Sequence, residues 1–143
     1  MIICGFPGTG KSTAVRLHKI GVDLESTPFS RNGQWLLYAE VAKHMSDNGD
    51  IVFVSTHKPM LDALEQVEAK YTVVIPPFDD KEHYYRRYVN RGNNADFCDK
   101  IYSNWDKWIA DIRSGRSFLK TVVTLPEGGC IAAWLEEYLR LKE

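Results

Sequence analysis

Short apolar runs alternate along this chain with longer segments in which apolar residues recur every three or four positions. The runs are rich in β-branched residues and are bounded by Gly, Pro, Asn or Asp, which predicts strands at 2–4, 22–24, 51–54, 71–75 and 121–125. The periodic segments predict about seven helices, including 11–19, 32–47, 80–91 and 96–113, one that begins near Pro59 and one that follows Gly129. This alternation is typical of a layered α/β domain with a largely parallel sheet.

Composition is that of an ordinary globular domain. The chain has 143 residues, of which 44% are hydrophobic and 26% charged, and its formal net charge is -1. This length is typical of one continuous core, so residues 1–143 are predicted to form a single domain. A net charge near zero gives no general attraction to nucleic acid or to an anionic membrane, so any polyanion must be bound by a local basic cluster.

The sequence also bears on the compartment. The first apolar segment, Met1–Cys4, runs directly into a glycine-rich loop and leaves no room for a secretory signal. No later apolar run is long enough to span a bilayer. Cys4, Cys98 and Cys130 are odd in number and include no CxxC pair. We therefore expect reduced, buried thiols and a cytoplasmic protein, as a monomer or a homodimer.

One motif carries specific chemistry: Gly5, Gly10, Lys11 and Ser12 match G-x-x-x-x-G-K-[ST] at every fixed position. Glycines let the backbone turn tightly around a phosphate chain, the lysine can bridge its β- and γ-phosphates, and the serine hydroxyl can ligate Mg²⁺. An apolar strand precedes the motif and a helical pattern follows it. The predicted ATP and Mg²⁺ site consists of Gly8, Thr9, Gly10, Lys11, Ser12 and Thr13. A glycine-rich turn with a solvated lysine is the alternative.

The layout around this motif resembles the nucleoside monophosphate kinase and shikimate kinase superfamily of P-loop kinases, and it is similar to short nucleotide kinases of bacteriophages. The resemblance covers nearly the whole chain as a pattern, with the loop as its one highly specific motif. It implies three layers: a five-stranded parallel sheet, helices on both faces and a small helical lid at about 79–94. It also implies transfer of the γ-phosphoryl group of ATP, with Mg²⁺, to a small acceptor.

Three arginines stand in the expected lid. Arg87 and Arg91 are four residues apart and share a helix face, with Arg86 beside them. In the resembling kinases, lid arginines neutralise the migrating phosphoryl group while the closed lid excludes water. Arg87 and Arg91 are therefore predicted to be catalytic. A solvated basic face, or arginines paired with Asp96 and Asp99, is the alternative.

An acidic pair, Asp23 and Glu25, stands at the end of the second predicted strand, where residues two apart point the same way. The pair looks like the D-x-D feature of shikimate-kinase-like enzymes. That resemblance implies a catalytic and metal-supporting role for Asp23 and acceptor binding for Glu25; helix-capping acids in a turn are the alternative. Arg31 is a candidate to hold an acceptor phosphate, with a simple surface role equally open.

The sequence departs from the familiar pattern after strand 51–54, which is followed by Ser55-Thr56-His57 and no aspartate. The missing acid argues against a motor or a GTPase. His57 is a candidate for contact with the acceptor, although a lone histidine is more often a capping or packing residue. In the resembling kinases, backbone after the last strand contacts adenine, which implicates Gly128; an ordinary turn is the alternative.

Aromatic residues form two groups. Trp105 and Trp108 lie among isoleucines at the spacing of a buried helix stripe, so core packing is the favoured interpretation. Phe29, Tyr84, Tyr85 and Tyr88 are weaker candidates for stacking on an acceptor base.

The acceptor stays open, with a nucleotide or nucleoside as the first candidate. Asp23 favours a hydroxyl acceptor and Arg31 a phosphate. A kinase that acts on a nucleic-acid end or a modified base needs a basic groove, and the net charge of -1 makes it less favoured. The arginines and the acidic pair argue against a module that binds ATP without transferring phosphate.

Overall fold

The computed structural model describes residues 1–24 and 33–142, which form an α/β fold. Its strands are β1 (Ile2–Gly5), β2 (Val22–Asp23), β3 (Val52–Val54), β4 (Tyr71–Ile75) and β5 (Lys120–Thr124). They form one sheet in the order β2-β3-β1-β4-β5, and every neighbouring pair is parallel. The prediction of a five-stranded parallel sheet is therefore confirmed.

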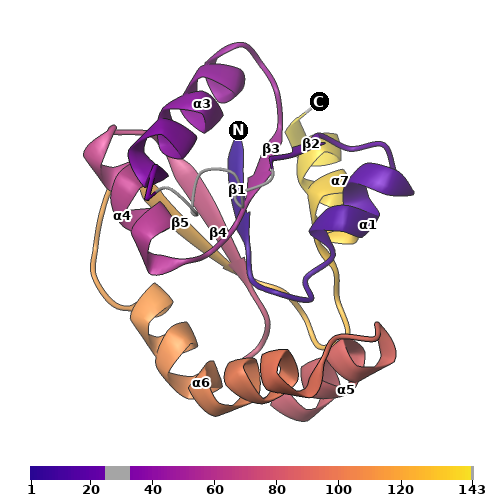
Figure 1. Ribbon diagram of the computed structural model, residues 1–143. Helices are drawn as coiled ribbons and strands as arrows, with labels where there is room; N and C mark the ends of the chain where they lie inside the picture. The colour runs from indigo at the N-terminus through magenta and orange to yellow at the C-terminus, as the bar shows by residue number, and fades with distance from the viewer. Residues whose placement is uncertain (25–32, 143) are drawn as a thin grey trace.

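Six helices are present in the described residues: α1 (Lys11–Arg16), α3 (Trp35–Asp47), α4 (Lys58–Gln66), α5 (Lys81–Asn90), α6 (Ala95–Arg113) and α7 (Ile131–Lys142). Helices α3 and α4 cover one face of the sheet and α1 and α7 the other, which gives three layers (Figure 1). Helices α5 and α6 lie across the carboxyl ends of the strands (Figure 1). None of the described helices is long and apolar enough to cross a bilayer.

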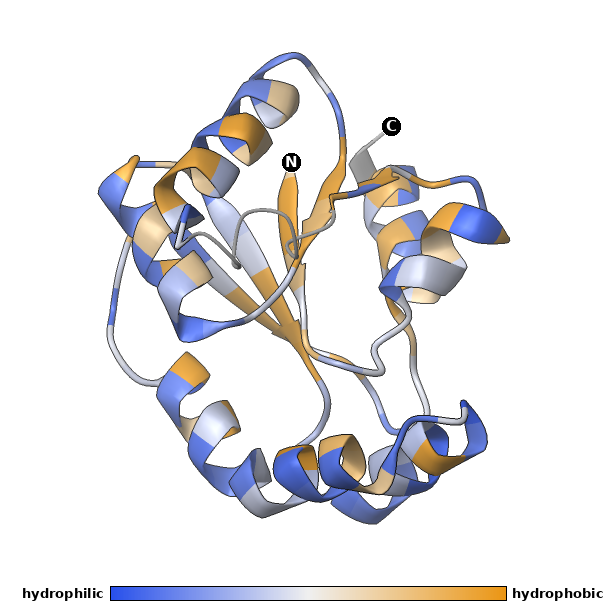
Figure 2. Ribbon diagram, in the orientation of Figure 1, coloured by the Kyte–Doolittle hydropathy of each residue, from blue (hydrophilic) through white to orange (hydrophobic). Residues whose placement is uncertain are grey.

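The buried residues form two clusters, one on each face of the sheet, and Figure 2 shows the apolar residues concentrated in the strands. In β1, Ile2 and Cys4 belong to the cluster under α3 and α4, whereas Ile3 belongs to the cluster under α1 and α7. This alternation makes β1 a central strand that is buried on both faces. Cys4 and Cys98 are buried, Cys130 is half-buried, and all three are free thiols.

Helix α1 ends at Arg16, about one turn before the predicted end at Lys19. The amide of Ile20 donates to the carbonyl oxygen of Ala14 at 3.0 Å, and Lys19 has φ 57°. A left-handed residue with a bond back across the last turn ends a helix. Periodicity missed this end because apolar residues continue the helical pattern past Arg16.

The parallel arrangement places the carboxyl ends of all strands at one edge. Strands β1, β2 and β3 end there at Gly5, Asp23 and Val54. The segments that follow these strands carry most of the side chains predicted to be functional. This edge, where ligands bind in open α/β sheets, is therefore where the site is expected.

Candidate functional site

The connection between β1 and α1, Gly5–Ser12, is a compact turn that we call the glycine loop. Gly8 has φ 86° and Gly10 φ 100°, values that residues with a side chain rarely adopt. The amide and the hydroxyl of Thr9 both donate to the carbonyl oxygen of Phe6, at 3.1 and 2.6 Å, and Thr9 is buried. These two bonds close the loop from inside.

Several amides of this loop and of the first turn of α1 find no acceptor among the described residues. Among the described residues, the backbone N–H groups of Gly8, Gly10, Ser12 and Thr13 donate to no other residue. The first bond of α1 runs from Ala14 to the carbonyl oxygen of Gly10 at 2.9 Å, and no side chain caps the helix. Such amides are satisfied by water or by an anion. The glycine loop thus has the donor arrangement of a phosphate site.

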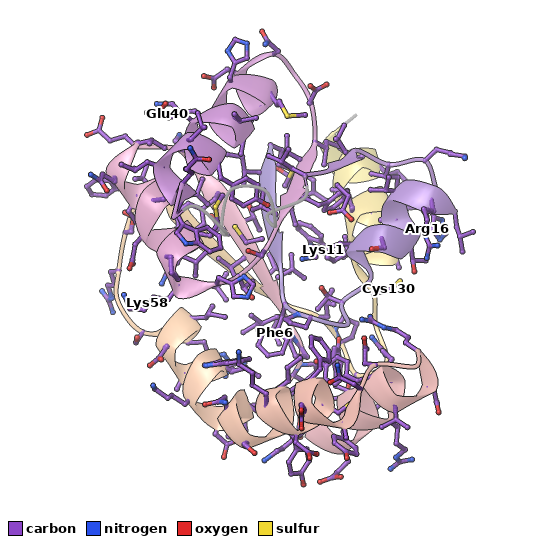
Figure 3. All side chains as sticks on the ribbon, viewed as in Figure 1. Phe6, Lys11, Arg16, Glu40, Lys58 and Cys130 are labelled. Atoms are coloured by element: carbon purple, nitrogen blue, oxygen red, sulfur yellow. The ribbon has the colours of Figure 1, made fainter. Side chains whose placement is uncertain are left out.

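The side chain of Lys11 folds back along β1. Its Nζ lies 3.4 Å from the carbonyl oxygen of Val54, where β3 ends. A Cβ at Gly5 would lie 2.7 Å from Lys11 Cγ, so only glycine leaves room for this position. Figure 3 shows Lys11 near the carboxyl ends of the central strands.

Helix α5 supports the glycine loop from behind. Arg87 Nη1 donates to the carbonyl oxygen of Gly8, and the hydroxyl of Tyr88 to that of Pro7, both at 2.7 Å. Tyr84 and Tyr88 are buried, and a Cβ at Gly8 would lie 2.7 Å from Tyr88 Cε1. The expectation that these two tyrosines stack on an acceptor base is therefore wrong, because their rings pack under the loop.

The two arginines predicted to be catalytic have different surroundings. Arg87 is bonded to Gly8, and its guanidinium lies 4.4 Å from the ring centroid of Tyr84. Arg91, one turn later, is exposed and lines the cleft beside the glycine loop. Arg86 is exposed and does not line that cleft. The packing of α5 thus separates an arginine that holds the loop from one that faces the cleft.

The segment between β5 and α7 contacts the glycine loop from the side, because the amide of Ile131 donates to the carbonyl oxygen of Thr9 at 2.8 Å. Gly128, predicted to contact adenine, does not line the cleft, and its amide lies 3.5 Å from Oδ2 of Asp80. Asp80 is only 6% exposed and also lies 3.4 Å from Nδ1 of His83. This buried carboxylate, which the sequence indicated only as a helix start, connects α5 to the segment that carries Gly128.

The predicted metal ligands come together at the loop. Oδ2 of Asp23, at the end of β2, lies 3.4 Å from Ser12 Oγ. Glu25, Arg31 and the stacking candidate Phe29 lie outside the described residues. Within the described ranges, no three His, Cys, Asp or Glu side chains form a metal-binding group. A hydroxyl and a carboxylate nevertheless fit Mg²⁺, which commonly uses one or two protein oxygens while phosphates and water supply the rest.

A cleft of about 1210 Å³ opens beside the glycine loop. The loop, Arg16 of α1 and the residues after β3 line its near end, while α4 and the second half of α6 line its far end. Phe6, Lys11 and Lys58, which all line it, are labelled in Figure 3. The cleft therefore joins the predicted phosphate site to a surface that the sequence did not single out.

His57, a candidate for contact with the acceptor, lines this cleft. Its Nδ1 lies 3.0 Å from Ser55 Oγ, and its ring centroid lies 5.8 Å from that of Trp35. His57 is exposed, and its partial desolvation at the cleft, followed by the positive charges of Lys11 and Lys100, lowers its pKa from the ordinary value of 6.5. The imidazole is therefore neutral at pH 7 and able to accept a proton.

Four residues at the far end of the cleft were not predicted to be functional: Lys58, Lys107, Trp108 and Arg116. Trp108 is half-buried, whereas Trp105, three residues earlier, is 1% exposed. The predicted core stripe is confirmed for Trp105, but Trp108 lies at its edge. A cation next to an aromatic residue, Lys107-Trp108, was the one sequence signal for a binding surface here. It was missed because helical periodicity alone assigns Trp108 to the core.

No family model, curated protein or solved structure matches this chain. The interpretation of the site therefore depends on its own residues. Around one cleft they combine amides that donate to no described residue, a lysine, a serine hydroxyl, a histidine and an exposed arginine, and the carboxylate of Asp23 lies beside that hydroxyl.

Proposed function

We propose that this protein is an ATP-dependent phosphotransferase of the P-loop kinase type. It would transfer the γ-phosphoryl group of ATP to a small acceptor, with a nucleotide or nucleoside as the first candidate. The observation that carries the proposal is the glycine loop, whose unsatisfied amides and Lys11 adjoin one cleft. The cleft volume of about 1210 Å³ exceeds the range of about 300–1,000 Å³ typical of ligand pockets, which favours two substrates side by side.

The triphosphate of ATP is assigned to the glycine loop. The amides of Gly8, Gly10, Ser12 and Thr13 would donate to phosphate oxygens, because they donate to no other described residue. Lys11 would leave the carbonyl of Val54 and bind the β- and γ-phosphates. The bonds of Thr9 inside the loop would keep this arrangement in place before the ligand arrives.

Phosphoryl transfer is assigned to Arg91 and His57. The bond from the γ-phosphorus to the bridging oxygen breaks, a bond to the acceptor oxygen forms, and ADP leaves with the bridging oxygen. A guanidinium beside the transferring oxygens stabilises the negative charge on them. Arg91 suits this role because it lines the cleft, and neutral His57 suits a hydroxyl acceptor, whose proton it can take.

Metal support is assigned to Ser12 and Asp23, whose oxygens lie 3.4 Å apart. Bound Mg²⁺ would neutralise phosphate charge. Asp23 does not line the cleft, which favours its role on the metal side over contact with the acceptor.

Arg87 and Tyr88 are assigned as positioning residues within the lid segment, 79–94. Both donate to carbonyl oxygens of the glycine loop. They would act on transfer through the shape of that loop rather than through contact with the reacting atoms. This assignment changes the predicted role of Arg87 and leaves Arg91, which follows the last residue of α5, as the catalytic arginine of the lid segment.

A transfer screen with ATP radiolabelled on its γ-phosphate tests the proposal. The acceptors are deoxynucleotides, nucleosides, small hydroxylated metabolites and short oligonucleotides. We expect labelled product with one class, and Lys11→Ala should abolish it. Lys70→Ala is the matched control, because Lys70 is exposed and does not line the cleft.

Two outcomes would contradict the proposal. Transfer by Lys11→Ala at the wild-type rate would show that the donor site lies elsewhere. ATP binding without transfer to any acceptor would leave a nucleotide-binding module in place of an enzyme.

A further inference from the structure

The cleft continues well beyond the glycine loop into a far arm between α4 and the second half of α6. The far arm reaches Tyr71 and Lys120, the first residues of β4 and β5. Gly5, where the loop begins, pairs with Val74 of β4, and Lys120, where β5 begins, pairs with Tyr71 of β4. Tyr71 precedes Val74 by three residues, so the start of β5 lies about 10 Å from the loop along the strands. Strand β5 also lies two strands from β1, or about 10 Å sideways.

Two cations of the far arm have no hydrogen-bond or ion-pair partner in the part of the chain that the structure describes. Lys107 and Arg116 line it and are exposed, and within the described residues neither makes a hydrogen bond or an ion pair. Asp111 is an exposed carboxylate in the same arm. The two cations outnumber it, so an anionic ligand is favoured there.

The remaining charges of the far arm are satisfied within the protein. Lys58 Nζ pairs with Asp62 at 2.8 Å. Glu65 accepts from the hydroxyl of Tyr71 at 2.6 Å and from that of Ser117 at 2.9 Å. Lys120 Nζ donates to two backbone carbonyl oxygens at 2.8 and 2.9 Å. These groups shape the arm, and Lys107 and Arg116 are left to bind a ligand.

Two aromatic rings accompany the unpaired cations. Trp108 follows Lys107 and presents a half-buried ring to the cleft. Phe118, two residues after Arg116, does not line the cleft; it is 99% exposed beside the far arm and contributes nothing to the core. Alternating cations and accessible rings are the arrangement by which proteins bind single-stranded nucleic acid, with phosphates beside the cations and bases stacked on the rings.

The length of the arm separates two kinds of acceptor. A mononucleotide carries its phosphate on the nucleotide that reacts at the glycine loop, so it has no charge for a cation at the far end. A strand carries further phosphates and bases beyond its terminal nucleotide. We propose, on the basis of the phosphotransferase function above, that the acceptor is the end of a single-stranded nucleic acid. Its terminal nucleotide enters beside the loop and its next phosphates lie along Lys107 and Arg116.

Binding of oligonucleotides by fluorescence anisotropy, without ATP, tests this inference. The probes are a mononucleotide, a dinucleotide and single strands of DNA and RNA up to about eight nucleotides, within the site sizes known for such grooves. We expect affinity to rise with length until the arm is filled. The logarithm of the binding constant should fall linearly with the logarithm of the salt concentration, with a slope of about -0.7 for each phosphate contacted.

Substitutions of the two cations in the far arm, and of Phe118 beside it, locate the binding. Lys107→Glu combined with Arg116→Glu should weaken strand binding at least 10-fold and reduce the salt slope by about 1.4, the value for two phosphates. Phe118→Ser should weaken it roughly 5-fold or more through lost stacking. Arg113→Glu is the matched control, because Arg113 lies on α6, is exposed and does not line the cleft. Thermal melting checks that each variant is folded.

The binding results distinguish failure of the strand inference from failure of the proposed phosphotransferase. Affinity that does not increase beyond the mononucleotide overturns the inference, and so does an equal loss in Arg113→Glu. Transfer of label to free nucleotides would then still support the phosphotransferase. Length-dependent binding that is lost in the double variant supports the far arm, even if no phosphate is transferred and the proposed catalysis fails.

Discussion

The glycine loop has one side against α5 and another side at the cleft, and the two differ in how their polar groups are satisfied. On the α5 side, the carbonyls of Pro7 and Gly8 each accept a 2.7 Å bond from a side chain, and the tyrosine rings behind them are buried. On the cleft side, the amides of Gly10 and Ser12 donate to no other described residue.

This difference shows which polar groups build the loop and which are left for a ligand. A polar group without a partner raises the free energy of the folded state, unless water or a ligand satisfies it. The loop carbonyls on the α5 side have met that requirement within the protein, so substitutions of their donors should change stability. The amides on the cleft side donate to no described residue, so substitutions there should change ligand binding and turnover.

The strongest test compares Arg91→Ala with Arg87→Ala. Loss of Arg91 should lower kcat about 10²–10³-fold with little change in melting temperature, because an exposed donor for transferring charge is removed. Loss of Arg87 should instead lower the melting temperature and raise the KM for ATP, because the loop loses its bond at Gly8. Steady-state kinetics with thermal melting measures both. Equal effects of the two variants on kcat and on melting would contradict the division of roles.

A second test uses two glycines with positive φ that differ in the space around them. Gly8→Ala should destabilise the fold by about 2–5 kcal/mol, because backbone strain adds to the clash with Tyr88. Gly92→Ala is the control: it has φ 82° with no atom within 4 Å, so strain alone should cost about 1–2 kcal/mol. Urea unfolding measures both. Equal losses would show that α5 does not press on the loop.

A third test removes one hydroxyl behind the loop. Tyr88→Phe should cost about 1 kcal/mol, because the carbonyl of Pro7 loses its donor while the buried ring remains. Tyr85→Phe removes only an exposed 3.3 Å bond to Asp99 and should cost less than about 0.5 kcal/mol. Urea unfolding of both variants decides whether the bond behind the loop matters.

The smallest expected effect concerns charge on the cleft side. Because partial desolvation and the charge of Lys11 lower the pKa of His57, its ring should take up a proton only as pH falls below the ordinary 6.5. ATP would place negative charge beside Lys11 and should raise that pKa toward 6.5. An NMR titration with and without ATP measures the shift, with His18 and His44 as internal controls. A pKa of His57 that ATP leaves unchanged would argue against phosphates near Lys11.

Much of the fold could be predicted from sequence, because strands and helices leave local patterns. All five strands lie where apolar runs predicted them, within one or two residues at their ends. The end of α1 was missed because it depends on the backbone conformation of Lys19, which has no apolar signature. Asp80 was missed as a buried charge because nothing local distinguishes it from Asp79.

Sequence alone determined the glycine loop, since its residues are contiguous and their chemistry needs no distant partner to be recognised. Only the tertiary structure decided what the side chains of α5 and α6 do. Arg87 and Arg91 share a helix face, yet Arg87 meets Gly8, 79 positions away, while Arg91 meets the cleft. Trp105 and Trp108 separate in the same way into core and cleft wall. Helical spacing fixes which side chains lie together, but the segment that packs against them determines whether they are buried, bonded or left for a ligand.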